Sequence, residues 1–153
     1  MRRANTTIYH RMRRLNARLA ANLKRGRGPT GTVLLLTTTG RTSGLPRETP
    51  LQFEEVDGVL HVASARGAQA DWFRNVVADP NVTVRARGRE FAALAEPVTD
   101  PTRIADFLQQ RLRSRPLMMR VMMTLLERLP LRYTQADLER ISSAKALVIL
   151  HEE

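Results

Sequence analysis

A series of short runs of strand-forming residues, separated by turns, limits what this chain can fold into. The turn signals Asp57-Gly58 and Arg87-Gly88 stand between consecutive runs, and such pairs are typical of β-hairpins. The run 81–86 alternates apolar with polar side chains, as an antiparallel strand with one buried face does. The runs of strand type are residues 32–39, 47–55, 59–63, 81–86, 89–98 and 146–150. They predict an α+β fold with a mainly β core, built as an antiparallel meander or barrel.

Other segments have helical periodicity. Residues 69–78 carry apolar side chains at helical spacing and predict a short crossover helix between two strands. Residues 100–141 predict a helical insertion, in which Asp100 caps the first helix and Pro101 opens it. Within the insertion, residues 117–129 are rich in methionine. For this stretch the alternatives are core packing, a protein interface or a lid over an apolar substrate pocket.

Residues 1–28 predict an N-terminal amphipathic helix. Its apolar residues recur at spacings of 4, 3, 4 and 4, opposite a set of arginines, and Gly26 and Gly28 end the helix. The apolar stripe consists of Ile8, Met12, Leu15, Leu19 and Leu23. It either docks on the domain or lies on an anionic membrane surface.

Composition narrows the class of protein. The chain has 153 residues without an internal repeat or a linker, which predicts one domain, residues 1–153. Cysteine is absent, so disulfides, cysteine-zinc sites and thiol nucleophiles are excluded. Without a signal peptide or membrane-spanning segment, we expect a cytoplasmic protein, with peripheral membrane association as the alternative. The formal net charge of +10 favours anionic partners. Aromatic residues make up only 5%, which argues against specific nucleic-acid binding.

The turn after the first strand run carries more functional groups than a hairpin needs. Gly40 and Gly44 allow close approach to the backbone, hydroxyl side chains add donors, and Arg41 and Arg47 add planar cationic groups. These groups together predict an anion-binding turn, and a solvated hairpin loop is the alternative. A second basic loop contains Ser64, Arg66 and Gly67. In a meander, alternate turns lie at the same end of the sheet, so the two loops are expected to converge on one ligand.

Protein catalysts of the usual kinds are scarce. His10, His61 and His151 are too scattered to predict a metal site. Ser43 lies between glycine-containing segments, but no nucleophile elbow surrounds it. Nucleophilic catalysis is therefore not expected, and redox chemistry would need a bound cofactor.

The functional turn carries a family resemblance. Residues 37–51 read TTTGRTSGLPRETPL and resemble the pattern T-T-x-G-R-K/R-S/T-G-x-x-R-x-x-P-L of the deazaflavin-dependent nitroreductase family. Further segments, ASARG (63–67), DWFRN (71–75) and ADPNV (78–82), resemble that family's A-S-x-K/R-G, P-x-W-Y/F-x-N-L and A-x-P-x-V segments, in the same order.

This resemblance implies an antiparallel split β-barrel of the flavin-reductase-like superfamily, which binds the 8-hydroxy-5-deazaflavin coenzyme F-420, with FMN as the alternative. The phosphate and oligoglutamate tail of F-420 would explain the basic turn. The implied coenzyme-binding residues are Arg41, Thr42, Ser43, Gly44, Pro46, Arg47, Ser64, Arg66, Gly67, Trp72 and Asn75. As the single tryptophan, Trp72 is equally suited to anchor the core.

The implied activity is an oxidoreductase that transfers hydride from reduced F-420 to a small apolar acceptor, such as a quinone, a nitro compound or an activated enone. Tyr133 is the proton donor suggested by the same resemblance. A non-catalytic protein that binds or carries F-420, FMN or haem is the alternative. The sequence departs from the family pattern at Thr42, where lysine or arginine is usual, and in the C-terminal segment after Tyr133. The oligomeric state is left open between monomer and homodimer.

Overall fold

A computed structural model describes residues 2–64, 66–114 and 116–153, with side chains described from His10 onward. The helices are α1 (Arg2–Lys24), α2 (Asp71–Ala78), α3 (Pro101–Ser114), α4 (Pro116–Glu127) and α5 (Gln135–Ser142), with a short 3-10 turn η1 (Gly67–Gln69) before α2. The strands are β1 (Val33–Thr39), β2 (Pro46–Gln52), β3 (Glu54–Val56), β4 (Val59–Ser64), β5 (Asn81–Ala86), β6 (Arg89–Val98) and β7 (Ala146–Glu152). The predicted fold class is confirmed.

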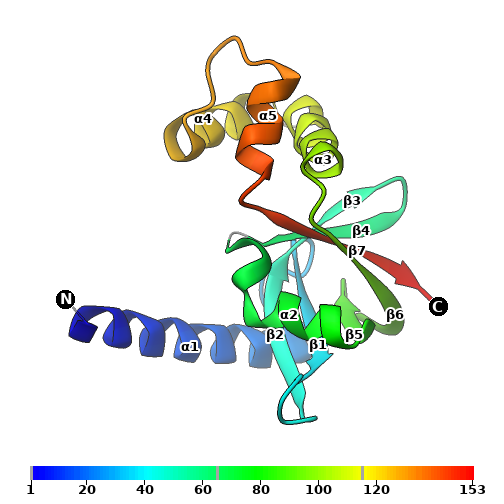
Figure 1. Cartoon of the computed structure of the whole chain (residues 1–153). Coiled ribbons are helices and arrows are strands. Elements are labelled where there is room, and N and C mark those ends of the chain that lie inside the picture. The colour runs from blue at the N-terminus through cyan, green and yellow to red at the C-terminus, as the bar shows by residue number, and fades with distance from the viewer. Residues whose placement is uncertain (1, 65, 115) are drawn as a thin grey trace.

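The strands form one antiparallel sheet in the order β2-β1-β5-β6-β7-β4-β3. β2 and β3 are at opposite edges of this sheet, yet Phe53 alone separates them in the chain. Two edges joined by one residue must lie close together, so the sheet has to curl into a half-barrel (Figure 1). The Phe53 amide donates to the Thr32 carbonyl at 3.1 Å where the chain passes between the edges. The single strand expected over 47–55 is therefore wrong, because a bend at Phe53 divides it into β2 and β3.

The turn signals behave as the sequence predicts. Asp57 and Arg87 have φ values of 52° and 52°, and the glycines after them have φ values of 79° and 78°. Positive φ at both central residues is the geometry of a type I′ hairpin turn, which follows the twist of the sheet. These turns make β3 with β4, and β5 with β6, antiparallel neighbours.

β7 explains why an apolar strand closes the chain. Ala146, Val148 and Leu150 face the core enclosed by the curled sheet. Leu147 and Ile149 face the other way and pack against a second core formed with the helices α3, α4 and α5. Both faces of β7 are therefore covered, one by the barrel interior and one by the helical group.

The helical insertion begins as its sequence indicates. Asp100 accepts a hydrogen bond from the Thr102 amide at 2.9 Å, and Pro101 is the first helical residue. The apolar side of α3 is buried, including Ile104, Phe107 and Leu112. In Figure 1 the helices α3 to α5 lie together above β7, and α2 lies below it.

Among the side chains described, from His10 onward, the last turns of α1 are the part that docks on the domain. Ala20 and Leu23 are buried with Val33 and Leu35 of β1, and Leu19 packs beside them. Met12 and Leu15 are exposed, and the Ile8 side chain lies outside the described residues. The expectation that the stripe docks is therefore right for its last part, whereas Met12 and Leu15 extend past the sheet. Figure 1 shows the N-terminal part of α1 projecting away from the sheet. Within the described ranges, no helix is long and apolar enough to cross a membrane.

Candidate functional site

The β1–β2 turn is held by its own backbone. The Gly40 amide donates to the Leu45 carbonyl at 2.8 Å, and the Gly44 amide donates to the Gly40 carbonyl at 2.8 Å. A β-carbon on Gly40 would lie 2.5 Å from Ser43 Oγ and 3.2 Å from the Leu45 carbonyl oxygen, so a side chain at this position would force Ser43 to move. Gly44 has a φ of +68°, a conformation that suits glycine. Two of the predicted amide donors are thus used inside the turn.

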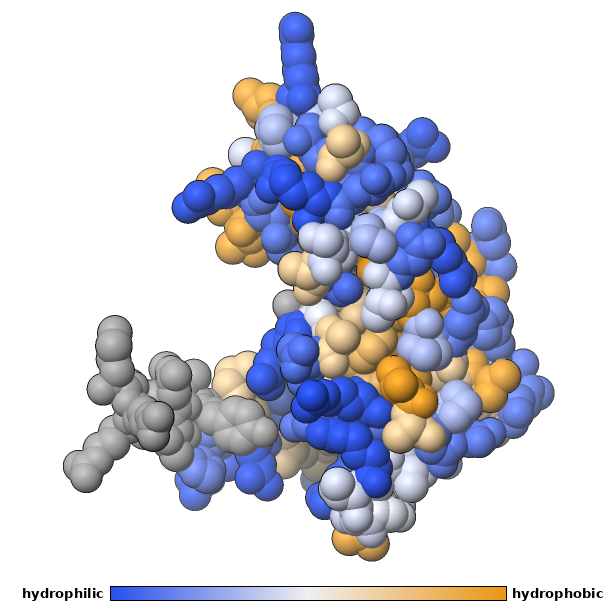
Figure 2. All heavy atoms as spheres, in the orientation of Figure 1, coloured by the Kyte–Doolittle hydropathy of each residue, from blue (hydrophilic) through white to orange (hydrophobic). Residues whose placement is uncertain are grey.

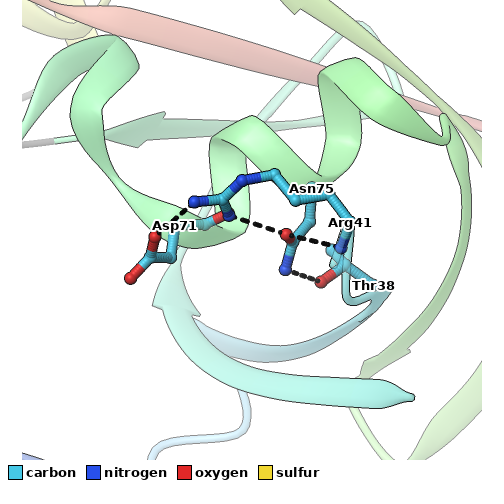
Figure 3. A network of polar contacts seen from close by, with 4 residues as sticks. All are labelled: Thr38, Arg41, Asp71 and Asn75. Atoms are coloured by element: carbon cyan, nitrogen blue, oxygen red, sulfur yellow. Dashed lines mark hydrogen bonds and ion pairs between the residues drawn. The ribbon is translucent and has the colours of Figure 1, made fainter. Parts of the chain in front are cut away.

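A buried amide ties this turn to α2 (Figure 3). Asn75 is 5% exposed, and its Oδ1 accepts from the Arg41 amide at 3.2 Å and from Arg41 Nη1 at 2.9 Å. Its Nδ2 donates to Thr38 Oγ1 at 3.2 Å. The side-chain amide therefore fills the space between the end of β1 and the helix, and it fixes the position of Arg41.

Arg41 is also paired with a carboxylate at the start of α2. Its Nη2 lies 2.9 Å from Asp71 Oδ1, and its Nη1 donates to the Asp71 carbonyl at 3.3 Å. The Arg41 side chain is 32% exposed and that of Asp71 is 68% exposed, so the pair faces solvent. Sequence reasoning missed Asp71 and Thr38 as members of this network. The i, i+4 spacing of Asp71 and Asn75 was the available signal, because it places both on one face of a helix.

The remaining groups of the turn are exposed. Ser43 Oγ accepts from the Leu45 amide at 3.2 Å and from Arg47 Nη2 at 3.5 Å. Arg47 thus folds back over the turn on the side of Ser43, while Arg41 extends toward α2. Thr42 and Pro46 are exposed beside them.

The loop after β4 contains two buried residues that hold its shape and one exposed arginine. Ser64 is 3% exposed, and its hydroxyl donates to the Gly67 carbonyl at 2.8 Å. Gly67 has a φ of +59°, and a β-carbon there would collide with the Ala144 carbonyl oxygen. Ser64 and Gly67 therefore shape the loop from inside, whereas Arg66 is exposed. Because η1 and then α2 follow directly, this loop leads into the helix end that Arg41 contacts.

α2 begins without a side-chain cap. Its N-cap is Ala70, which provides no side-chain hydrogen bond. The amides of the first turn of a helix have no partners within the helix, and they attract anions together with the helix dipole. At the other end of α2, the pKa of Asp79 is lowered, mainly because Asn81 donates to its carboxylate from its side chain and its backbone.

Trp72 and Tyr133, the two predicted aromatic site residues, lie in different parts of the molecule. Trp72 is half-buried, meets Phe73 edge-on at 6.0 Å between ring centroids and packs against the barrel core. Tyr133 belongs to the second core, and its ring lies 5.7 Å from the Arg120 guanidinium. The helical group that contains Tyr133 and the helix α2 lie on different sides of β7 in Figure 1. Tyr133 as a proton donor stays a prediction.

The curled seven-stranded antiparallel sheet places the chain in the class of split β-barrel proteins. A family model described as F-420H(2)-dependent quinone reductase matches residues 2–131, and the chain belongs to this family. It is therefore an F-420-dependent reductase, and F-420 is its cofactor. The resemblance found in the sequence is confirmed.

Solved structures agree on the fold. One described as a domain-swapped dimer is 18% identical, with a TM-score of 0.54 over 97% of this chain and 99% of that chain. An F-420-H2 dependent reductase is 20% identical, with a TM-score of 0.50 over 78% of this chain and 94% of that chain. The haem storage protein HutZ of Vibrio cholerae is 16% identical, with a TM-score of 0.51 over 80% of this chain and 82% of that chain.

Proposed function

We propose that the anion cradle, defined as residues 40–47 of the β1–β2 turn, Arg66 and the N-terminal turn of α2, binds the phosphate and acidic tail of F-420. The observation that carries this proposal is the tether from Asn75 to Arg41, which holds a basic turn against the uncapped end of a helix. Exposed guanidinium groups and free helix amides are the donors that phosphates and carboxylates prefer. The donor set therefore suits a polyanionic coenzyme.

Bound F-420H(2) supplies the hydride, and the chain supplies binding, orientation and exclusion of water. We propose that the acceptor is a small apolar molecule such as a quinone, a nitro compound or an activated enone. The family description, F-420H(2)-dependent quinone reductase, makes a quinone the first choice. Tyr133 is the proposed proton donor in this scheme.

Binding by the cradle is tested with two arginines that have no part in the Asn75 tether. Arg47→Ala and Arg66→Ala each remove one exposed cation, and we expect each to weaken F-420 binding about tenfold, since a charged hydrogen bond contributes roughly 1.5 kcal/mol or more. Arg14→Ala in α1 removes the same charge outside the cradle and serves as the control. Titration of each purified variant with F-420 gives the dissociation constants. Equal constants for all three variants would place the coenzyme elsewhere.

Turnover is tested separately from binding. Reduced F-420 is mixed with the protein and a panel of menadione, a nitroaromatic and an enone, and coenzyme oxidation is followed by absorbance. Oxidation that requires an acceptor from the panel supports the proposed acceptor class, and Tyr133→Phe should slow it without changing coenzyme affinity. Tight binding without oxidation by any acceptor would instead favour the carrier alternative. The same preparation can then be titrated with FMN and haem.

A further inference from the structure

α4 exposes an unusually apolar surface. Met119 and Met123, spaced i and i+4, are 2% and 3% exposed and attach the helix to the second core. Two adjacent rows at the same spacing face outward instead, and they contain no polar side chain. The rows are Leu117, Val121 and Leu125, and Met118, Met122 and Leu126. α4 is thus apolar both where it docks and where it meets solvent.

The exposure of this face exceeds what an isolated surface leucine shows. Leu117, Leu125 and Leu126 are 79%, 75% and 74% exposed, and the neighbouring Leu131 is 78% exposed. Leu117, Val121, Leu125 and Leu131 line one shallow hollow. Contiguous apolar surface of this kind marks a site that binds a partner or a membrane. We call this surface, residues 117, 118, 121, 122, 125, 126 and 131, the α4 face.

Arginines border the α4 face, and α4 itself carries one acidic residue, Glu127. Glu127 is already paired with Lys145 at 2.6 Å, so it offers little negative charge to a partner. Arg120 and Arg132 line the same hollow as the leucines. Figure 2 shows hydrophobic side chains beside strongly hydrophilic ones on the part of the upper helical group where Figure 1 places α4.

One arginine is fixed at the edge of the apolar rows. Arg120 Nη2 donates to the Leu131 carbonyl at 2.7 Å, and its guanidinium lies over the Tyr133 ring. The structure therefore holds a cation and a half-buried tyrosine next to exposed leucines. Aromatic rings with a polar tip and arginines at the border of an apolar face are typical of helices that lie in the surface layer of a bilayer.

We infer that the α4 face docks on the surface of an anionic lipid bilayer. The apolar rows enter the boundary between headgroups and acyl chains to a depth of about 5 to 10 Å, and the arginines pair with lipid phosphates. A second copy of this chain suits the face less well. Two copies packed through the α4 face would bring Arg120 and Arg132 of one copy near those of the other, and like charges repel. Charge complementarity favours the anionic membrane.

The inference is tested by sedimentation of the full chain with lipid vesicles. Vesicles of phosphatidylcholine with about one-third phosphatidylglycerol are compared with phosphatidylcholine alone, at low and high salt. We expect binding to the anionic vesicles that weakens with salt and is weak on the neutral ones. Absence of binding to anionic vesicles at low salt would overturn the inference.

Matched double variants locate the contact. Val121→Asp with Leu125→Asp places two carboxylates on the α4 face, whereas Val77→Asp with Leu94→Asp changes the same residue types at other exposed positions. We expect the first pair to reduce vesicle binding at least about tenfold and the second pair to reduce it much less. Equal losses for the two pairs would overturn the inference, since they would reflect net charge alone.

Two further measurements control for unfolding and for self-association. Circular dichroism checks that the variants fold. If the aspartate pair on α4 unfolds the protein, Arg113→Ser with Arg132→Ser replaces it, and we expect this variant to lose vesicle binding at low salt. Unchanged vesicle binding in that charge variant would overturn the inference. Sedimentation equilibrium without lipid measures self-association. The protein could instead form a dimer and not bind vesicles, and Val121→Asp with Leu125→Asp could dissociate that dimer. This result would assign the α4 face to a second copy and overturn the membrane inference.

Discussion

Asp71 brings a negative charge into a group of cations that is otherwise suited to anions. Its Oδ1 lies 2.9 Å from Arg41 Nη2. The pair is exposed, so its own contribution to stability is small. A bound phosphate or glutamate would have to share Arg41 with this carboxylate. We therefore expect Asp71 to lower the affinity of the proposed cradle while it keeps Arg41 in position.

Asp71→Asn should consequently strengthen binding of F-420. We expect the dissociation constant to fall about three- to tenfold, because one unfavourable charge near a polyanion is removed and an amide can still hydrogen-bond Arg41. Asp106→Asn on α3 makes the same charge change far from the cradle in the chain and is the control. Titrations at low and high salt measure both. Weaker binding by Asp71→Asn would mean that Asp71 positions Arg41 more than it competes.

The loop between β4 and α2 depends on one glycine. Gly67 combines a φ of +59° with close contact to the Ala144 backbone, whereas Gly58 has a φ of +79° and open space around its α-carbon. Both Gly→Ala changes place a side chain at positive φ, which costs about 1 kcal/mol. Gly67→Ala must also displace the chain between α5 and β7. We expect it to lose at least about 2 kcal/mol more than Gly58→Ala in urea unfolding. Similar losses would show that the loop yields easily.

The strands and turns were predictable because they depend on local signals. Glycines after Asp57 and Arg87 place the type I′ turns. Residues 146–150 are apolar on both faces of the strand because one face packs in the barrel core and the other against the helical group. The bend at Phe53 was not predictable in this way, because it depends on closure of the sheet. The same holds for the cradle. Its arginines were visible in the sequence, but the Arg41–Asp71 pair joins the β1–β2 turn to α2 and exists only once α2 packs beside β1.

β6 and β7 are also joined by side-chain charges. Glu96 accepts from His151 at 2.9 Å and pairs with Arg103 at 2.8 Å, and these contacts, His151 first, lower the pKa of Glu96 from its ordinary value of 4.5. A carboxyl with a lowered pKa in the folded state stabilises the fold above its unfolded pKa. That contribution is lost as the pH falls through the folded pKa.

Glu96→Gln should therefore lower the free energy of unfolding at neutral pH and lose this effect in acid. We expect the wild type and Glu96→Gln to differ above the ordinary pKa of 4.5 and to converge in acid, once the pH has fallen below the lowered pKa of Glu96 in the folded state. Urea unfolding at a series of pH values measures the difference. Glu153→Gln, at the end of the chain, removes the same formal charge without these contacts and is the control. A difference between wild type and Glu96→Gln that persists in acid would attribute the effect to packing.

From His10 onward, where the side chains are described, the contacts of α1 with the domain come from its last turns. Leu23, at 4% exposed, and Ala20, at 7% exposed, pack on β1, and Lys24 pairs with Glu48 at 2.6 Å. Arg85 adds a hydrogen bond to the Lys24 carbonyl at 3.0 Å. All of these contacts come from the last turns of a 23-residue helix. The exposed Met12 and Leu15 precede them, on a segment with many arginines.

Deletion of residues 2–17 should hence leave the fold as stable as before. We expect the free energy of unfolding in urea to change by no more than about 0.5 kcal/mol. Leu23→Ala should lower it by about 2 to 4 kcal/mol, because it leaves a cavity where α1 packs on β1. A large loss on deletion would mean that the early turns of α1 pack on the domain in solution. With stability unchanged, the deletion also tests the alternative that the exposed part of α1, rather than the α4 face, contacts the membrane. Loss of anionic vesicle binding in the deletion alone, with Val121→Asp and Leu125→Asp without effect, would assign that contact to α1 and remove it from α4.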